Sequence, residues 1–251
     1  MKLDSKRYEI AGISDVGLVK KVNEDSLLYK VAHKGDGLAA LCVVADGVGN
    51  LQCGEVASSI AVKEFSKWWE EIFMNHCDDY EYLKKTLYDS IYLASSKILD
   101  LRTSKNIRSA STLALLFLYD NKCQIYSVGD SRVYQVKKGA FRYKMQQLTE
   151  DHSCEIDKEI NNTIVKKSVL TEYLGKIDNL SVFSKEIKVG TEDVFIVCSD
   201  GIYKTMKEQE IKEIIVQNKD DMKMLCNSLI LKVRDNMEKD NISVIAIKVC
   251  E

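Results

Sequence analysis

The stretch LAALCVVADGVG, residues 38–49, holds the pattern on which the fold of this chain depends. Its first eight residues, 38–45, are all apolar and rich in β-formers, and the run ends at Asp46. A run of this kind closed by Asp and Gly is typical of a strand that leads into a turn. The runs at 8–14 and 25–32 have the same character, so the chain is predicted to open with three strands.

Two amphipathic helices are predicted next, over residues 54–73 and 79–101. In both segments apolar residues recur at steps of three and four, the spacing that lines one face of an α-helix. Each apolar stripe needs a sheet or another helix to cover it, so these helices are expected to pack against the predicted strands.

Strands and helices follow one another again in the second half of the chain. The predicted strands there are 112–120, 122–129, 132–139, 181–189, 193–198 and 242–249, and the predicted helices are 207–217 and 220–236. Residues 151–178 are polar and weakly periodic, which indicates a loop or a small helical excursion. Strand blocks separated by helix pairs, in place of alternating βαβ units, predict an α+β fold with helices packed on antiparallel sheets.

Composition excludes several classes of protein. The 36 Lys and Arg nearly balance the 38 Asp and Glu, which argues against a dedicated binder of nucleic acid or of membrane surfaces. No apolar run approaches the ~20 residues of a membrane helix, and the N-terminus lacks the apolar core of a signal peptide. The eight cysteines are scattered without a C-x-x-C pair, so a reduced, cytoplasmic protein is expected. With no internal repeat or linker, residues 1–251 are expected to form a single domain.

The positions of the acidic residues carry the chemical signal. Four of them stand where an apolar strand meets a turn: Asp46, Asp130, Asp200 and Asp240. A fifth acidic feature, Glu24-Asp25, precedes the strand at 26–32. Residues at the ends of different strands can converge on one point, and carboxylate oxygens suit hard cations such as Mg²⁺ and Mn²⁺.

A purely structural role for these residues stays open at this point. An Asp-Gly after a strand is by default a turn signal, and each of them alone can be explained in that way. Several recur after unusually apolar strands, however, where an unneutralised carboxylate would be costly. Considered without any known family, the metal site and the set of turns have about equal support.

Eight motifs carry a specific resemblance to a known family. They are SDVGLVKKVNED (14–25), VADGVG with GEVAS (44–58), STLA (111–114), VGDSRVY (128–134), QLTEDHS (147–153), LTEYLG (170–175), CSDGI (198–202) and DNISVI (240–245). In this order and spacing they are similar to the motifs of the metal-dependent type 2C protein phosphatases, the PPM family, in its bacterial branch. The resemblance extends over nearly the whole chain.

The resemblance implies an α-β-β-α sandwich of two antiparallel sheets flanked by helix pairs. It also implies a metal-dependent hydrolase that removes phosphate from phosphoserine and phosphothreonine in proteins. The cofactors would be two Mn²⁺ or Mg²⁺ ions with a third, weaker one possible, and a water that bridges the two ions would attack phosphorus in line. The implied partners are phosphorylated proteins and a cognate Ser/Thr kinase, with no nucleic acid and no membrane. A monomer is expected, because no helix shows a coiled-coil seam.

The site residues follow from the resemblance by position. Asp46 would bridge both ions, the Gly47 carbonyl would bind the second, and Asp200 with Asp240 would hold the first. The remaining implied metal ligands are Glu24 and Asp25, for the second ion or its waters, and Asp130, for the third.

Two features depart from the family pattern. Lys20 stands where the family usually has the Arg that holds the substrate phosphate. Lysine can supply the charge but not the bidentate fork, although Lys20 can also be simply a solvated surface residue. The flap segment, residues 154–169, is short for the bacterial branch, and because flaps border the active site, its length bears on the choice of substrate proteins.

Three classes of function remain to be compared. The first is the phosphoprotein phosphatase, and the second is a non-catalytic relative that binds phosphoproteins as a regulator. Such a relative normally lacks a metal ligand, whereas all the expected ones are present here. The third is a metal-dependent phosphodiesterase acting on nucleotides, against which the acidic pI and the absence of a basic groove signature count.

Overall fold

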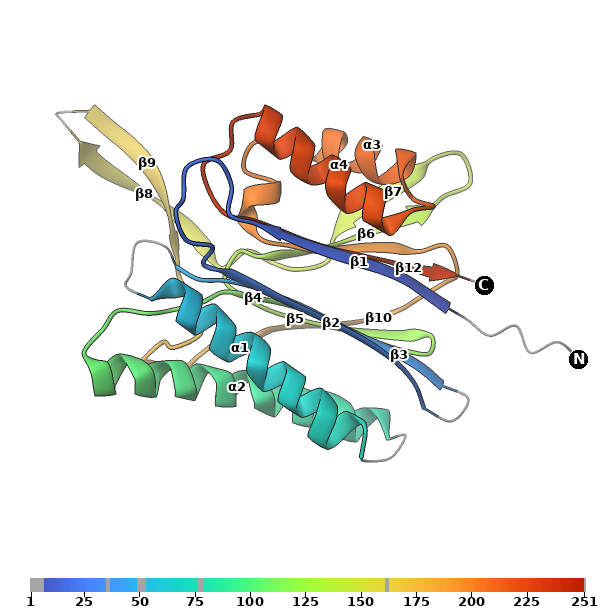
Figure 1. Cartoon of the computed structure of the whole chain (residues 1–251), viewed down its shortest axis with the longest axis horizontal. Helices are drawn as coiled ribbons and strands as arrows, with labels where there is room; N and C mark the ends of the chain where they lie inside the picture. Colours follow the sequence, from blue (N-terminus) through green and yellow to red (C-terminus); the bar gives the residue numbers. More distant parts are fainter. Residues whose placement is uncertain (1–6, 35–36, 49–52, 76–78, 161–162, 251) are drawn as a thin grey trace, which may run out of the picture.

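Two five-stranded antiparallel sheets face each other, and a pair of helices covers the outer face of each (Figure 1). The structure is a computed structural model, and it describes residues 7–34, 37–48, 53–75, 79–160 and 163–250. The predicted α-β-β-α sandwich is therefore confirmed. No helix in these ranges is both long and apolar enough to cross a membrane.

The first sheet has the strand order β10-β5-β4-β3-β2. Its strands are β2 (Asp25–Lys34), β3 (Gly37–Asp46), β4 (Leu113–Tyr119), β5 (Lys122–Val128) and β10 (Phe183–Lys188). Helix α1 (Gly54–Trp68), the π-helical turn η1 (Trp69–Phe73) and helix α2 (Tyr80–Lys105) cover its outer face. The helix predicted at 54–73 thus contains a change to the wider π form in its last five residues.

The second sheet has the strand order β1-β12-β11-β6-β7. Its strands are β1 (Arg7–Asp15), β6 (Arg132–Lys138), β7 (Tyr143–Gln147), β11 (Val194–Cys198) and β12 (Ile242–Cys250). Helices α3 (Glu208–Gln217) and α4 (Met222–Asp235) cover its outer face. Strand β7 was not among the predicted strands, because its residues alternate between half-buried and exposed and include no run of β-formers.

The run at 38–45 is apolar throughout because both faces of β3 are covered. Leu41 and Val43 pack in the core under α1 and α2, whereas Cys42 and Val44 pack in the core between the two sheets. Successive side chains of a strand point to opposite faces, so a strand between two apolar layers needs apolar residues at every position. The first polar residue after this run is therefore Asp46, where β3 ends.

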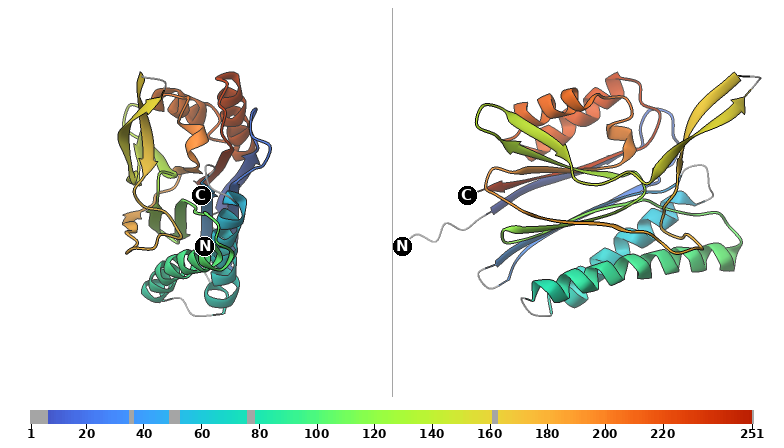
Figure 2. Two further views of the ribbon diagram at one scale, coloured as in Figure 1. Left: turned by 90° about the vertical axis from the view of Figure 1, so that its left-hand side faces the viewer. Right: turned by 180° about the vertical axis from the view of Figure 1, so that it is seen from behind.

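The prediction of a loop or helical excursion at 151–178 is wrong for the part that contains residues 153–160 and 163–170. Strands β8 (Ser153–Ile160) and β9 (Thr163–Leu170) form an antiparallel hairpin that projects from one end of the sandwich (Figures 1 and 2). Its described side chains are mostly exposed, and Lys166 pairs with Glu155 across the two strands at 2.9 Å. A hairpin that is exposed on both faces needs no apolar alternation, so the pattern by which strands are predicted is absent from its sequence.

Candidate active site

The ends of five strands bring the predicted carboxylates together at one end of the sandwich. Asp25 at the start of β2 lies directly opposite Asp46 at the end of β3. The other three aspartates follow β5, follow β11 and precede β12, and together with Asp46 they line one cavity of about 530 Å³: Asp130, Asp200 and Asp240. The structure therefore gathers residues that are up to 215 positions apart, as the spacing of strands and turns predicted.

Asp46 is held by hydrogen bonds of its backbone to the start of β4. Its N–H donates to the Thr112 hydroxyl at 3.0 Å, and its carbonyl accepts from the Thr112 N–H at 2.8 Å. The next residue, Gly47, donates its N–H to the Glu24 carbonyl at 3.0 Å. A Cβ atom on Gly47 would lie 2.3 Å from the Gly54 carbonyl oxygen, so only glycine fits where α1 begins beside the site.

Asn241 ties the segment that contains Lys20 and Glu24 to the start of β12. Its side-chain amide accepts from the Glu24 N–H at 3.0 Å and donates to the carbonyls of Val16 at 2.9 Å and Val22 at 3.1 Å. Asn241 was not a predicted site residue. The signal that could have found it is its place directly after Asp240, because an amide can satisfy donors and acceptors of a neighbouring loop together.

Two carboxylate oxygens of the site are buried without a hydrogen-bond partner in the described part of the chain. They are Oδ1 of Asp25 and Oδ1 of Asp200. The second oxygen of Asp25 accepts from the Ser199 hydroxyl at 2.8 Å, so this side chain is oriented but only half satisfied. Because a buried charged oxygen without a partner is costly, both oxygens fit a bound cation, and carboxylates suit Mg²⁺ or Mn²⁺.

The crowding of carboxylates changes their acidity. Burial, followed by the charges of Asp25 and Asp200, raises the pKa of Asp46 well above its usual value. Burial, with the charge of Asp200 as the next cause, raises the pKa of Asp130 to about 6. The pKa of Asp25 is raised as well, again mainly by burial. The carboxylates of the cluster therefore repel one another when they are ionised, and nearby cations would stabilise their ionised forms.

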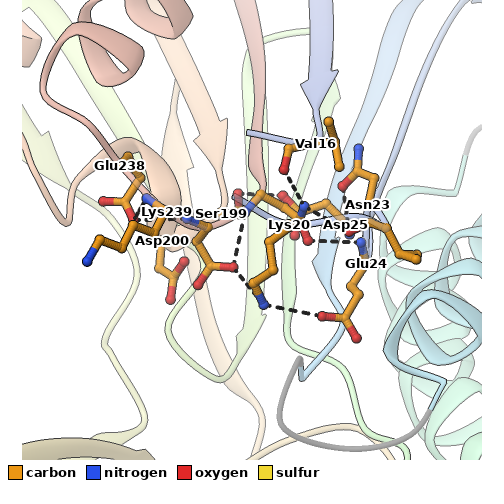
Figure 3. Close-up of polar contacts among 12 residues, drawn as sticks. Val16, Lys20, Asn23, Glu24, Asp25, Ser199, Asp200, Glu238 and Lys239 are labelled. Atoms are coloured by element: carbon orange, nitrogen blue, oxygen red, sulfur yellow. Dashed lines mark hydrogen bonds and ion pairs between the residues drawn. The ribbon is translucent and has the colours of Figure 1, made fainter. Parts of the chain in front are cut away.

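Two lysines supply part of that charge. The Lys204 ammonium lies 2.5 Å from Asp200 Oδ2 and 3.0 Å from Asp240 Oδ2. The Lys20 ammonium lies 3.5 Å from Glu24 Oε2 and 3.4 Å from Asp240 Oδ1 (Figure 3). Burial alone would raise the pKa of Asp240, but Lys204 and Lys20 outweigh it, and the pKa is lowered.

The lysines lie between carboxylates that are expected to share metal ions. Among the described residues, no three His, Cys, Asp or Glu side chains are already grouped as a metal-binding set. Lys204 was not a predicted site residue. In the sequence it could have been found by its position four residues after Asp200. A short 3-10 helix, η2 (Asp200–Ile202), begins at Asp200, so Lys204 follows about one turn later.

Comparison with known proteins identifies the family of this chain. The profile of the family described as protein phosphatase 2C matches residues 19–232 of this chain. The chain belongs to the protein phosphatase 2C family.

Several protein phosphatases are similar to this member of the family along nearly its full length. The serine/threonine phosphatase stp of Listeria monocytogenes is 29% identical over 248 residues, which cover 94% of this chain and 93% of that protein. Protein phosphatase PhpP of Streptococcus pneumoniae is 23% identical over 219 residues, which cover 84% of this chain and 85% of that protein.

Solved structures of protein phosphatases share the fold of this chain. The S. agalactiae serine/threonine phosphatase superposes with a TM-score of 0.82 at 21% identity and covers 97% of this chain and 100% of that one. The catalytic domain of PstP, in complex with two manganese ions, superposes with a TM-score of 0.76 at 20% identity and covers 98% and 100%.

One wall of the cavity in this protein phosphatase 2C family member consists of residues that the sequence did not single out. The Arg132 guanidinium contacts both carboxylate oxygens of Asp151 and lies 3.4 Å from the centre of the Tyr203 ring. The Tyr203 hydroxyl donates to the Asp130 carbonyl at 2.6 Å. These contacts fix the turn that carries Asp130, so Tyr203 and Arg132 position a predicted ligand without being ligands themselves.

Proposed function

We propose that this chain is a metal-dependent phosphatase that hydrolyses phosphoserine and phosphothreonine in proteins. One observation supports this proposal most strongly: in a protein phosphatase 2C fold, four of the proposed ligands line one cavity, and a buried oxygen of one of them, Asp200 Oδ1, has no hydrogen-bond partner among the described residues. The substrates would be phosphorylated proteins, including those of a cognate Ser/Thr kinase. The described cysteines are free thiols, as suits a protein that works in a reducing compartment such as the cytoplasm.

The proposed ligands divide between two ions. Asp46 would contact both, Asp200 and Asp240 the first, and the Gly47 carbonyl the second. The residues proposed to complete the second site or a third, weaker one are Glu24, Asp25 and Asp130. When bound, Mn²⁺ or Mg²⁺ would activate a water for in-line attack at neutral pH and neutralise the phosphoryl oxygens.

The protein's own residues would orient the proposed ligands and offset part of their negative charge. Asn241 and Thr112 hold the backbone on either side of the carboxylates, so the ligands need little rearrangement. Lys20 lies at the edge of the carboxylate cluster with its side chain about one-third exposed, and we propose that it contacts the substrate phosphate as a point charge. Lys204 touches both Asp200 and Asp240, so its ammonium would have to move when an ion occupies the space between them.

The test is hydrolysis of p-nitrophenyl phosphate and of a phosphothreonine peptide, with Mn²⁺ and with EDTA. We expect hydrolysis of both in Mn²⁺, none in EDTA, and a loss of at least about 100-fold in Asp200→Asn, because removing a ligand should cost more than disturbing its supporting shell. The matched control is Asp89→Asn, an exposed residue of α2. Full activity in EDTA would contradict the proposal.

The same assay addresses the other two classes of function. A non-catalytic regulator would bind the phosphopeptide without cleaving it under any condition. A phosphodiesterase would cleave bis-p-nitrophenyl phosphate in preference to the monoester. We expect neither result, because four of the proposed ligands line the cavity and its walls also have lysine and arginine for a dianionic phosphate.

A further inference from the structure

A second hollow of about 380 Å³ opens beside the catalytic cavity, and we call it the side groove. It lies between the segment after α2 and strand β9 of the hairpin. The residues on which its properties depend are Val48, Arg102, Arg108, Lys167, Val169 and Tyr173. Val48 and Lys167 also line the catalytic cavity, so the two hollows are adjacent.

The two hollows differ in charge. The catalytic cavity is lined by five aspartates and four basic residues. The described lining of the side groove contains Arg102, Arg108 and Lys167 and no acidic residue. Positive charge is therefore concentrated on the side of the cleft away from the carboxylate cluster, where it would attract an anionic group.

The exposed cations of the side groove have no ion-pair partner among the described residues. Arg102 donates a hydrogen bond to the Gly175 carbonyl, which holds its side chain in place. Arg108 and Lys167 are exposed, and neither has an ion-pair partner in the described ranges. By contrast, the neighbouring Lys166 is paired with Glu155 on the same hairpin. Two charges thus remain available for a ligand.

The floor and walls of the side groove are partly apolar. Val48, Val169 and Tyr173 contribute to its lining, and Val169 is 37% exposed. Val48 is only two residues from Asp46, the proposed ligand of both ions. A peptide that presents a phosphorylated residue to Asp46 would therefore place a neighbouring residue over Val48 and into the side groove.

We propose that the side groove binds an acidic side chain next to the phosphorylated residue of a protein substrate. This inference rests on the proposed phosphatase function and adds a preference for substrates whose phosphorylation site is flanked by Asp or Glu. Arg108 and Lys167 would pair with the carboxylate, and the apolar lining would contact the stem of the substrate chain. The catalytic carboxylates would not be involved.

Binding and hydrolysis test the inference separately. Two fluorescent peptides carry a non-hydrolysable phosphonate analogue of phosphothreonine, flanked on both sides by Asp in one and by Asn in the other. Their dissociation constants are measured by fluorescence anisotropy in Mn²⁺. The corresponding phosphothreonine peptides are then used as substrates. We compare the wild type, the double variant Arg108→Gln with Lys167→Gln, and the charge-matched control Lys63→Gln with Lys223→Gln, which changes exposed helix residues.

We expect the wild type to bind the Asp-flanked peptide about fivefold more tightly than the Asn-flanked one, as for one or two exposed ion pairs. This ratio should fall to about one in the double variant and persist in the control. Equal affinities in the wild type, or an unchanged ratio in the double variant, would overturn the inference. Failure to hydrolyse either phosphothreonine peptide would instead contradict the proposed function, so the two failures are distinguishable.

Discussion

The catalytic cavity and the side groove together form a cleft, and the carboxylate side and the hairpin side of this cleft are built in opposite ways. On one side, carboxylates stand at the ends of buried strands, and the segments that carry them donate backbone hydrogen bonds to the Thr112 hydroxyl and to the side-chain amide of Asn241. On the other side, the β8–β9 hairpin projects with mostly exposed side chains and a surface ion pair between Lys166 and Glu155. The residues proposed for the chemistry are thus placed by the core, whereas the hairpin residues proposed to meet a substrate protein stand on an element with little burial.

Among the residues that support the two sides, the largest effect is expected at Asn241, on the side that the core holds. Replacing Asn241 by Ala removes three hydrogen bonds and leaves the Glu24 N–H and two carbonyls without their partner. We expect a loss of about 1–3 kcal/mol in the free energy of unfolding and of about 10–100-fold in kcat/KM. Urea unfolding and p-nitrophenyl phosphate hydrolysis in Mn²⁺ measure the two effects.

The matched control for this change is Asn227→Ala, since that amide donates only to the Lys223 carbonyl on the exposed face of α4. It should leave both quantities within experimental error. If Asn241→Ala behaved like this control, the segment that contains Glu24 would be held by something other than Asn241, and the contrast between the two sides of the cleft would be weakened.

An intermediate effect is expected at Lys204, which bridges the carboxylates. Lys204→Met leaves Asp200 and Asp240 without that neighbour, so the metal-free protein should lose about 1 kcal/mol of stability, a modest value because Lys204 is 42% exposed. Mn²⁺ should bind about fivefold more tightly, since it no longer displaces an ammonium group. Thermal unfolding in EDTA and calorimetric titration with Mn²⁺ measure these two quantities.

Lys85→Met is the control, because Lys85 makes an exposed ion pair with Asp89 far from the proposed ligands. It should change neither the metal-free melting temperature nor the Mn²⁺ affinity by a comparable amount. Weaker Mn²⁺ binding in Lys204→Met than in the wild type would show that the lysine supports the ion instead of competing with it.

The smallest effect is expected on the hairpin side. Glu155→Gln removes the pairing with Lys166, but both side chains are about two-thirds exposed or more. The free energy of unfolding should therefore change by no more than about 0.5 kcal/mol. Urea unfolding, with Glu71→Gln as another exposed ion-pair deletion, measures it. A loss above about 1 kcal/mol would mean that the hairpin contributes to the free energy of unfolding of the whole domain.

The buried strands, the helix pairs and the positions of the carboxylates at strand ends could be predicted from the sequence because each depends on a local pattern. The run at 38–45 is apolar at every position since it lies between two apolar layers, and its end at Asp46 is a local signal of a turn. The hairpin at 153–170 could not be predicted in this way, because exposed strands need no such pattern.

By itself, the sequence determined the buried strands, the amphipathic helices and which carboxylates stand at strand ends, since these follow from periodicity between near neighbours. Only the tertiary structure decided that Asn241 reaches Glu24 across 217 positions, that Lys204 lies between Asp200 and Asp240, and that Arg108 and Lys167 share a groove. Such contacts depend on how two sheets pack and where their loops meet. No pattern between adjacent residues contains that information.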